Sequence, residues 1–325
     1  MTDAYIGIKG SVIVFGEEDP RGTAVTTDRS AGAYQSWSFN ETKDVVETHS
    51  DGSVESIAIT TGKYKVGGSF NVRVQRFDML EYILGEFTDT TTTYTTHTRN
   101  GADNCLKSIT LGKSFYDCNA DATILTGKYV GTVIKSVDIN LNDRDPINMD
   151  VSWEAIKPDN STDTVANVSL TDNLFGAKQW SFKIADQGGS PAALPQVTDC
   201  KLSFKRDVTT AGGSGSVSDL QKDLGLFTTR VTGNMFFYSK DMYDDFMNSS
   251  TTVADGEVEK VIEITGTNGL ATTALRSFSF TIEHCNASDF NTKRASNTSY
   301  IIVPFTYTGR LEAVSIIDNT ANWNA

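Results

Sequence analysis

The 325-residue sequence predicts a mainly β fold made of two tandem β-sandwich or barrel domains, each with one short α-helix. Three observations lead to this prediction: apolar and polar residues alternate along most of the chain, helical periodicity is confined to two short stretches, and the two halves resemble each other. Alternation with a period of two is typical of strands that bury one face. It occurs in the segments 70–74, 137–141, 149–155, 200–204, 278–282 and 301–307.

Helical spacing of apolar residues is found at 76–87 and at 240–247. Each stretch follows a predicted strand, and its apolar residues recur every three or four positions. We expect both apolar stripes to pack into the core of their domain.

The two halves of the chain share residues at a constant separation. Residues 44–84 align without gaps with 207–247 and are identical at 9 of 41 positions, against roughly 2 or 3 for unrelated sequences of ordinary composition. Gly52, Ser53 and Val54, for example, match Gly215, Ser216 and Val217. Both predicted helices fall in register in this alignment.

This similarity predicts a tandem duplication. We expect a first domain at 1–157, a linker at 158–172 and a second domain at 173–325. The linker is polar and rich in turn-forming residues, as connections between domains commonly are. The first domain contains a segment at about 88–128 without a clear counterpart in the second, and we expect this segment to be an insertion.

The charge and the spacing of the cysteines argue against several functions for this chain. With 28 Lys and Arg against 41 Asp and Glu, the net charge is −13, so the chain lacks the broad cationic face that binds nucleic-acid phosphates. A basic leader and an apolar run of about 20 residues are absent from the sequence, and we expect no membrane association. Cys105, Cys118, Cys200 and Cys285 show no metal-site spacing. We expect all four to be reduced thiols, with a Cys105–Cys118 disulfide as the alternative.

The sequence contains no recognisable catalytic or metal-binding constellation, so we expect neither an enzyme nor a cofactor. His49, His97 and His284 lie far apart, and a Ser or Cys nucleophile needs a base within reach. Cys285 follows His284 directly, and neighbours on a strand point to opposite faces. Two carboxylates from different strands could still converge as in a glycoside hydrolase, so a β-sandwich hydrolase stays as one alternative.

The order of elements in each half resembles that of the tail tube proteins of tailed bacteriophages and related viruses, in a duplicated form. Each half has an initial strand, a strand such as QSWSFNETKDVV, a loop, a strand ending in GGSFNVRVQRFDM, a short helix and two long alternating strands. The resemblance is carried by 36–84 and 129–155 in the first half and by 199–247 and 275–308 in the second.

The resemblance implies a structural protein of the virion tail that is made in the host cytoplasm. Six domains of the family form a ring, the inner strands join into one barrel, and stacked rings form a hollow tube that delivers the genome. Partners are then further copies of the chain and other tail proteins. The alternative in another class is a β-rich virion or surface binding protein, such as an adhesin or a receptor-binding module.

Three expectations follow from the resemblance. Because one chain carries two domains, three chains supply six, so we expect homotrimeric pseudo-sixfold rings, with a hexamer of chains as the alternative. DNA passes through the lumen without specific binding, so we expect the wall to be neutral or negative. The family implies that long loops reach the neighbouring ring, and the candidates here are His49, Ser50, Asp51, Gly52, Ser53 and Val54, together with Gly212, Gly213, Ser214, Gly215, Ser216 and Val217.

Overall fold

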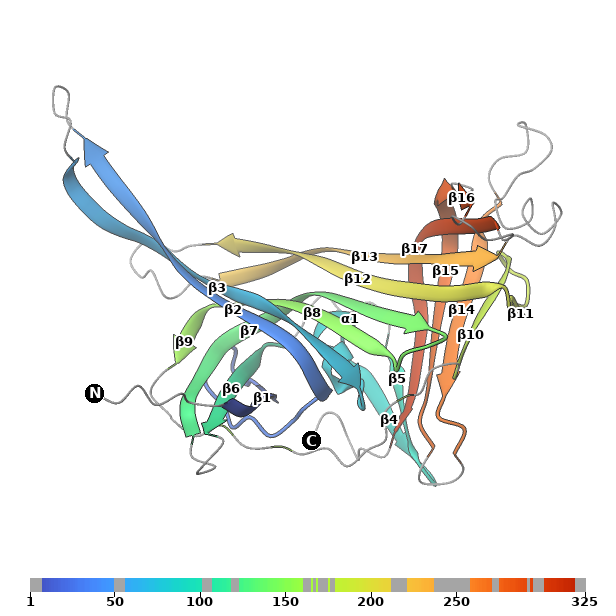
Figure 1. The fold of residues 1–325 in the computed structure, drawn as a ribbon, viewed down its shortest axis with the longest axis horizontal. Coiled ribbons are helices and arrows are strands. Elements are labelled where there is room, and N and C mark those ends of the chain that lie inside the picture. The colour runs from blue at the N-terminus through green and yellow to red at the C-terminus, as the bar shows by residue number, and fades with distance from the viewer. Residues whose placement is uncertain are drawn as a thin grey trace.

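The computed structural model describes residues 8–49, 56–100, 107–117, 123–159, 165, 168, 175, 179–211, 221–236, 258–270, 275–290, 293–294 and 301–318. Most of these residues lie in antiparallel strands, and among them only 78–84 are helical (Figure 1). The prediction of a mainly β fold is confirmed.

The strands are named in chain order. The first half of the chain (residues 8–159) contains β1 (Ile8–Glu17), β2 (Gly32–His49), β3 (Ser56–Val74), β4 (Phe87–Thr91), β5 (Thr95–Arg99), β6 (Ile109–Asp117), β7 (Thr123–Asn142), β8 (Asn148–Ala155) and β9 (Lys157–Asp159). The second half (residues 179–318) contains β10 (Trp180–Asp186), β11 (Ala192–Ala193), β12 (Val197–Ala211), β13 (Gln221–Phe236), β14 (Lys260–Thr267), β15 (Ser277–Phe290), β16 (Lys293–Arg294) and β17 (Ile301–Asp318).

Eight strands form one continuous antiparallel sheet, here called the long sheet. Its order is β2-β3-β8-β7-β12-β13-β17-β15. The first four strands come from the first half and the last four from the second. Backbone hydrogen bonds between β7 and β12 therefore join the two halves of the chain (Figure 1).

Each half adds a smaller sheet that packs against the long sheet. In the first half, β6 pairs with β1 and with the early part of β7, and Phe115 on β6 contacts Trp37 on β2 with ring centroids 4.9 Å apart. In the second half, β14 pairs with β10 and β15, and Phe182 on β10 contacts Phe305 on β17 at 5.6 Å. Aromatic contacts of this kind bury large apolar areas between the sheets.

The hydrophobic core is continuous between the two halves. Phe175, which lies between them in sequence, is 2% exposed, and its ring centroid lies 5.4 Å from Phe77 and 5.7 Å from Phe278. The Trp180 indole N–H donates to the Asn142 carbonyl at 3.0 Å. Side chains from both halves are therefore buried in one core around the junction.

The described helical segment lies beside the β7–β12 junction. A 3-10 turn (Asp78–Leu80) leads into α1 (Glu81–Leu84), which is buried and contacts both β7 and β12. The helix is shorter than the expected 76–87, because Gly85 with φ of 100° ends it and β4 begins two residues later. The second predicted helix, at 240–247, lies outside the described residues.

The β4–β5 hairpin reaches from the first half to β17 of the second, pairing from Thr98 with Ser315 to Thr95 with Asp318. His97 is fully buried there, with Nδ1 at 2.6 Å from Asp89 Oδ1 and Nε2 at 2.9 Å from Asp318 Oδ1. Burial lowers the pKa of His97, but the hydrogen bonds and charges of the two carboxylates outweigh it and raise the pKa. The hairpin is thus held to the second half by a buried polar contact.

Asp78 is a second buried acid near this contact, at 2% exposure. Burial raises its pKa to about 7, the charge of Asp318 adds to the rise, and Arg29 and Arg76 oppose it. The folded state therefore keeps a proton that the unfolded state loses, so this group lowers the free energy of unfolding as the pH rises from about 4 to about 7.

We predict that Asp78→Asn removes this pH dependence. The variant should gain stability over the wild type as the pH rises from 4 to 8, by up to about 4 kcal/mol for a shift of this size. Urea unfolding at pH 4 and at pH 8 measures the difference in stability between variant and wild type. His97 titrates in both proteins, so its contribution to this difference largely cancels. A stability difference that is the same at both pH values would contradict the prediction.

Candidate assembly interface

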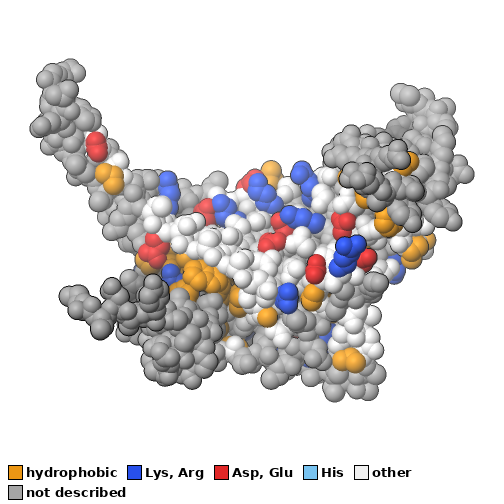
Figure 2. All heavy atoms as spheres, viewed as in Figure 1, with side chains coloured by type: hydrophobic (Ala, Val, Ile, Leu, Met, Phe, Trp, Pro, Cys, Tyr) orange, Lys and Arg blue, Asp and Glu red, His pale blue; other side chains and the backbone are white. Residues whose placement is uncertain are grey.

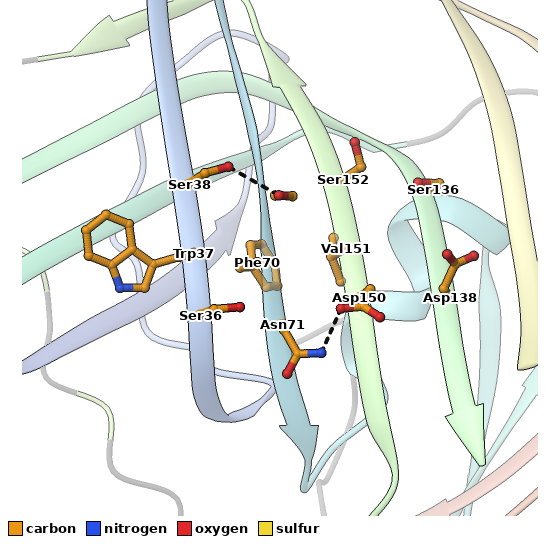
Figure 3. A pocket seen from close by; sticks show the side chains of 11 residues that line it. Ser36, Trp37, Ser38, Phe70, Asn71, Ser136, Asp138, Asp150, Val151 and Ser152 are labelled. Carbon is orange, nitrogen blue, oxygen red and sulfur yellow. Dashed lines mark hydrogen bonds between the residues drawn. The ribbon is translucent and has the colours of Figure 1, made fainter. Parts of the chain in front are cut away.

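The two faces of the long sheet differ in chemistry because residues on a strand alternate between them. The face toward the smaller sheets is apolar, with Val72, Val137, Leu202 and Val231 fully buried. The opposite face, here called the polar face, has a shallow hollow over β2, β3, β8 and β7 (Figure 3). Most side chains lining this hollow are short and polar: Ser36, Ser38, Ser69, Asn71, Ser136, Asp138, Asp150 and Ser152.

Hydrogen bonds between neighbouring strands satisfy many of these groups. Ser38 Oγ lies 3.2 Å from Ser69 Oγ, and the Asn71 amide donates to Asp150 Oδ1 at 2.6 Å (Figure 3). The Asn140 amide donates to the other carboxylate oxygen of Asp150 at 2.7 Å. Among the residues that the structure describes, neither histidine nor cysteine lines the hollow.

Two lysines of the polar face are paired with acids. Lys201 on β12 lies 2.6 Å from Asp138 on β7 and bridges the two halves, and Lys135 lies 2.5 Å from Glu154. Figure 2 shows basic and acidic side chains interleaved across the middle of the molecule. Close pairing of opposite charges reduces the field that this surface presents to a passing polyanion.

The β7–β12 junction is a complete strand-to-strand interface. Seven residues of each strand are paired, from Asp199 with Asn142 to Lys205 with Ser136. On the apolar face, Leu202 lies opposite Ile139 and Phe204 opposite Val137, and all four side chains are fully buried. Backbone pairing and apolar contact act together here, as they do when one chain adds a strand to the sheet of another.

The long sheet ends in two strand edges. Among the described residues, β2 pairs only with β3 in this sheet, and residues 286–290 of β15 pair only with β17. Unpaired backbone N–H and C=O groups along such edges are ready to pair with another strand. The edges are therefore the candidate sites for contact between copies of the chain.

The β2 edge carries an exposed aromatic group. Trp37 is 41% exposed and contacts Phe39 and Phe115 at centroid distances of 5.6 Å and 4.9 Å. Lys113 Nζ lies 4.7 Å from the centre of the Phe39 ring, a distance suited to a cation–π contact. Figure 2 shows apolar side chains gathered beside this part of β2.

The loops predicted to contact the next ring lie at the ends of two hairpins. His49 is the last residue of β2 and pairs with Ser56, and the β2–β3 hairpin extends away from the body of the molecule (Figure 1). The loop residues 50–55 and 212–220 lie outside the described residues. Their role in stacking stays a prediction.

Two cysteines can be located. Cys200 and Cys285 are free and buried. Burial raises the pKa of both thiols, that of Cys285 to about 12, so neither is a reactive thiolate at neutral pH. Cys105 and Cys118 lie outside the described residues.

The part of the chain that the structure describes contains no group of three or more His, Cys, Asp or Glu placed to hold a metal ion. It also contains no helix long and apolar enough to cross a membrane.

Reasoning from the sequence alone missed the β7–β12 junction and the free edges. It identified both strands from their alternation at 137–141 and 200–204, but it assigned the connection between the halves to the linker 158–172. The order of strands within the repeat was the available signal, because a repeated four-strand unit can place its last strand beside the first strand of the next unit.

Comparison with known proteins supports a family assignment. No curated protein matches the chain. A family model described as phage tail tube protein matches residues 9–309, which contain all or part of every strand of the long sheet and of both smaller sheets. A structural role in the virion tail accords with a long sheet that ends in two strand edges. The chain belongs to the phage tail tube protein family.

Proposed function

We propose that this protein self-assembles into rings of three chains, which stack into the hollow tail tube through which the genome is delivered. The observation that carries the proposal is the β7–β12 junction, where the second half joins the first as a separate subunit would. The chain acts as a structural protein of the virion tail and performs no catalysis. Other tail proteins meet the two ends of the tube.

The strand pairings support a tandem duplication. The β2–β3 ladder has irregularities after Tyr34 and after Lys43, and the β12–β13 ladder has them after Val197 and after Arg206. Both positions recur after 163 residues, the separation at which the sequence itself repeats. Irregularities that leave one residue unpaired are specific features of a ladder, so their recurrence favours a common origin.

The later strands of the two halves also correspond. The β7–β8 ladder is irregular between Ile134 and Ser136, and the β15–β17 ladder is irregular at three places, one of them between Ala287 and Asp289. We therefore propose domains at 1–157 and 173–325, each of which contributes four strands to the long sheet. Within the expected insertion at 88–128, β6 corresponds to β14, and the β4–β5 hairpin accounts for much of what the first domain has in addition.

A repeated four-strand unit accounts for ring closure. The unit β2-β3-β8-β7 is followed by β12-β13-β17-β15, and the same head-to-tail contact repeated with a fixed rotation closes into a ring. Three chains supply six such units, with true threefold and approximate sixfold symmetry. In a ring of six chains, only one domain of each chain could belong to the inner wall, and the other would lie outside it.

The polar face is suited to line the bore. Its serines and asparagines are hydrogen-bonded within the sheet, and Lys201 and Lys135 are paired with acids. DNA is held by cations that are free to replace its counterions. Pairing of these lysines, on a chain of net charge −13, favours passage of DNA without specific binding.

We predict that deletion of Ser50–Gly52 abolishes tube formation and leaves the protein folded and soluble. The deletion shortens the loop that is proposed to reach the next ring and leaves the paired strands intact. Negative-stain microscopy detects tubes, and circular dichroism confirms the fold. Asp51→Gly, which keeps the loop length, is the control and should form tubes. Tubes of normal length from the deletion variant would refute the role of this loop.

We predict that rings released from this deletion variant contain three chains. Each chain has a mass of 35.3 kDa, so native mass spectrometry separates a trimer from a hexamer without ambiguity. A ring with six copies of the chain would contradict the trimer and support a wall built by one domain per chain.

A further inference from the structure

The β4–β5 hairpin meets β17 of the second half at a buried polar cluster. The His97 imidazole lies between Asp89 of β4 and Asp318 of β17, with Nδ1 2.6 Å and Nε2 2.9 Å from the two carboxylates. The exposed fraction is 0% for the His97 side chain, 10% for Asp89 and 4% for Asp318. We propose that His97 is an imidazolium that holds the hairpin against β17, and that loss of one ring proton releases the hairpin. This inference does not depend on ring assembly.

The two short distances require two protons. An ionised carboxylate accepts hydrogen bonds and donates none, so each contact needs a hydrogen between nitrogen and oxygen. A neutral imidazole carries one N–H and supplies only one of the two. The second proton belongs on the His97 ring, because the unperturbed pKa of histidine is about 6.5 and that of aspartic acid about 3.9.

The charged groups at or beside the cluster come from both halves of the chain: Asp89, Asp318, Asp78, Arg29, Arg76 and Arg99. Burial lowers the pKa of His97, and the hydrogen bonds and charges of Asp318 and Asp89 raise it by more. Asp78 acts through Asp318: burial raises the pKa of Asp78 to about 7, and the charge of Asp318 adds to the rise. The stabilisation from His97 is therefore fully present below its unfolded pKa of about 6.5 and is lost as the pH rises through the higher folded pKa.

Loss of a ring proton breaks the contact between the halves. Asp89 lies directly opposite His97 within the hairpin and closer to the ring than Asp318 does, so the remaining proton stays on Nδ1. Nε2 and the Asp318 carboxylate then face each other as two acceptors without a hydrogen. Buried acceptors without a partner are costly, and separation of β5 from β17 lets water reach both.

The pairing between the hairpin and β17 is short and mostly polar. Residues 95–98 pair with 315–318 at four positions, at the far end of β17 (Figure 1). Phe87 is the only apolar residue in either strand of the hairpin. Segments with few buried apolar contacts open locally at low cost, so the charge state of His97 has a large effect on this pairing.

The base of the hairpin is held by a group that does not titrate. The Arg99 guanidinium donates to the Leu84 carbonyl at 2.8 Å and to the Leu311 carbonyl at 3.2 Å. Arginine keeps its charge throughout the pH range in which histidine titrates. The hairpin therefore opens about a base fixed by Arg99, and its release exposes the outer edge of β17 at 315–318 to pairing with another strand.

NMR of the histidine rings tests the protonation state in the full chain. The sequence contains three histidines, at 49, 97 and 284, so ¹⁵N-histidine labelling gives few signals. His49→Gln and His284→Gln assign the signals of His97 by elimination. At pH 7 we expect His97 to carry two ring N–H protons, both protected from exchange with water. A neutral His97 ring with one N–H at pH 7 would overturn the proposal.

Hydrogen exchange at pH 6 and at pH 10 tests the release. In the wild type we expect the protection factors of amides in 95–98 and 315–318 to fall at least tenfold between these values. In Asp318→Asn the new amide donates to the neutral Nε2, so protection should change less than twofold. Asp89→Asn does the same at Nδ1 and serves as the second variant. Amides of 200–204, at the β7–β12 junction, should keep their protection in every protein.

Asp78→Asn is the matched control, because it removes the neighbouring titrating acid and keeps the cluster itself. The fall in protection at 95–98 should persist in this variant. Its loss in Asp78→Asn would make Asp78 the group that controls the hairpin and would overturn the proposal. Unchanged protection of 95–98 in the wild type, or a tenfold fall in both Asp318→Asn and Asp89→Asn, would overturn it as well.

Discussion

Backbone pairing between β7 and β12 is the interaction on which the arrangement of this protein depends. It joins four strands from each half into one sheet and places Leu202 and Phe204 on a shared apolar surface. Phe175 and α1 pack beside the same junction, and the β4–β5 hairpin extends the contact to β17. Loss of this pairing would leave edge strands exposed in both halves, a condition that proteins generally avoid.

The division of the long sheet into two chemically distinct faces follows from the strand period. On one face, residues such as Val137 and Val151 are buried against the smaller sheets. On the other, Asp138 and Asp150 lie in a network of hydrogen bonds and ion pairs. A single sheet therefore supplies both a stable core and a polar surface, and the chain belongs to a family of structural proteins of the virion tail.

The sequence was sufficient to predict the class of the fold and many of its strands, because alternation at positions such as 137–141 and 200–204 directly reflects burial of one face. It was less informative about which strands pair. β7 and β12 are separated by a polar segment, and nothing in either strand specifies the other as its neighbour. Trp37 illustrates the same limit: it contacts Phe39 and Phe115 but is 41% exposed, at an edge where no described strand pairs with the outer side of β2.

Buried polar groups were equally hard to predict. His97 lies in a Thr-rich run, a composition common in exposed loops and edges, yet it is fully buried between Asp89 and Asp318. That burial depends on pairing between β5 and β17, which are more than 200 residues apart. The stacking loops at His49–Val54 and Gly212–Val217 were proposed from the family resemblance, and deletion experiments are needed to test them.

In the proposed assembly, the junction within the chain is repeated between neighbouring chains and closes the wall of the tube. Cryo-electron microscopy of the assembled tube, at a resolution that separates adjacent strands, tests this arrangement. We expect an unbroken wall of strands spaced by about 4.8 Å around the bore, with the β4–β5 hairpin outside it at three places per ring. A gap in strand pairing between chains, or six copies of the whole chain around one ring, would rule this arrangement out.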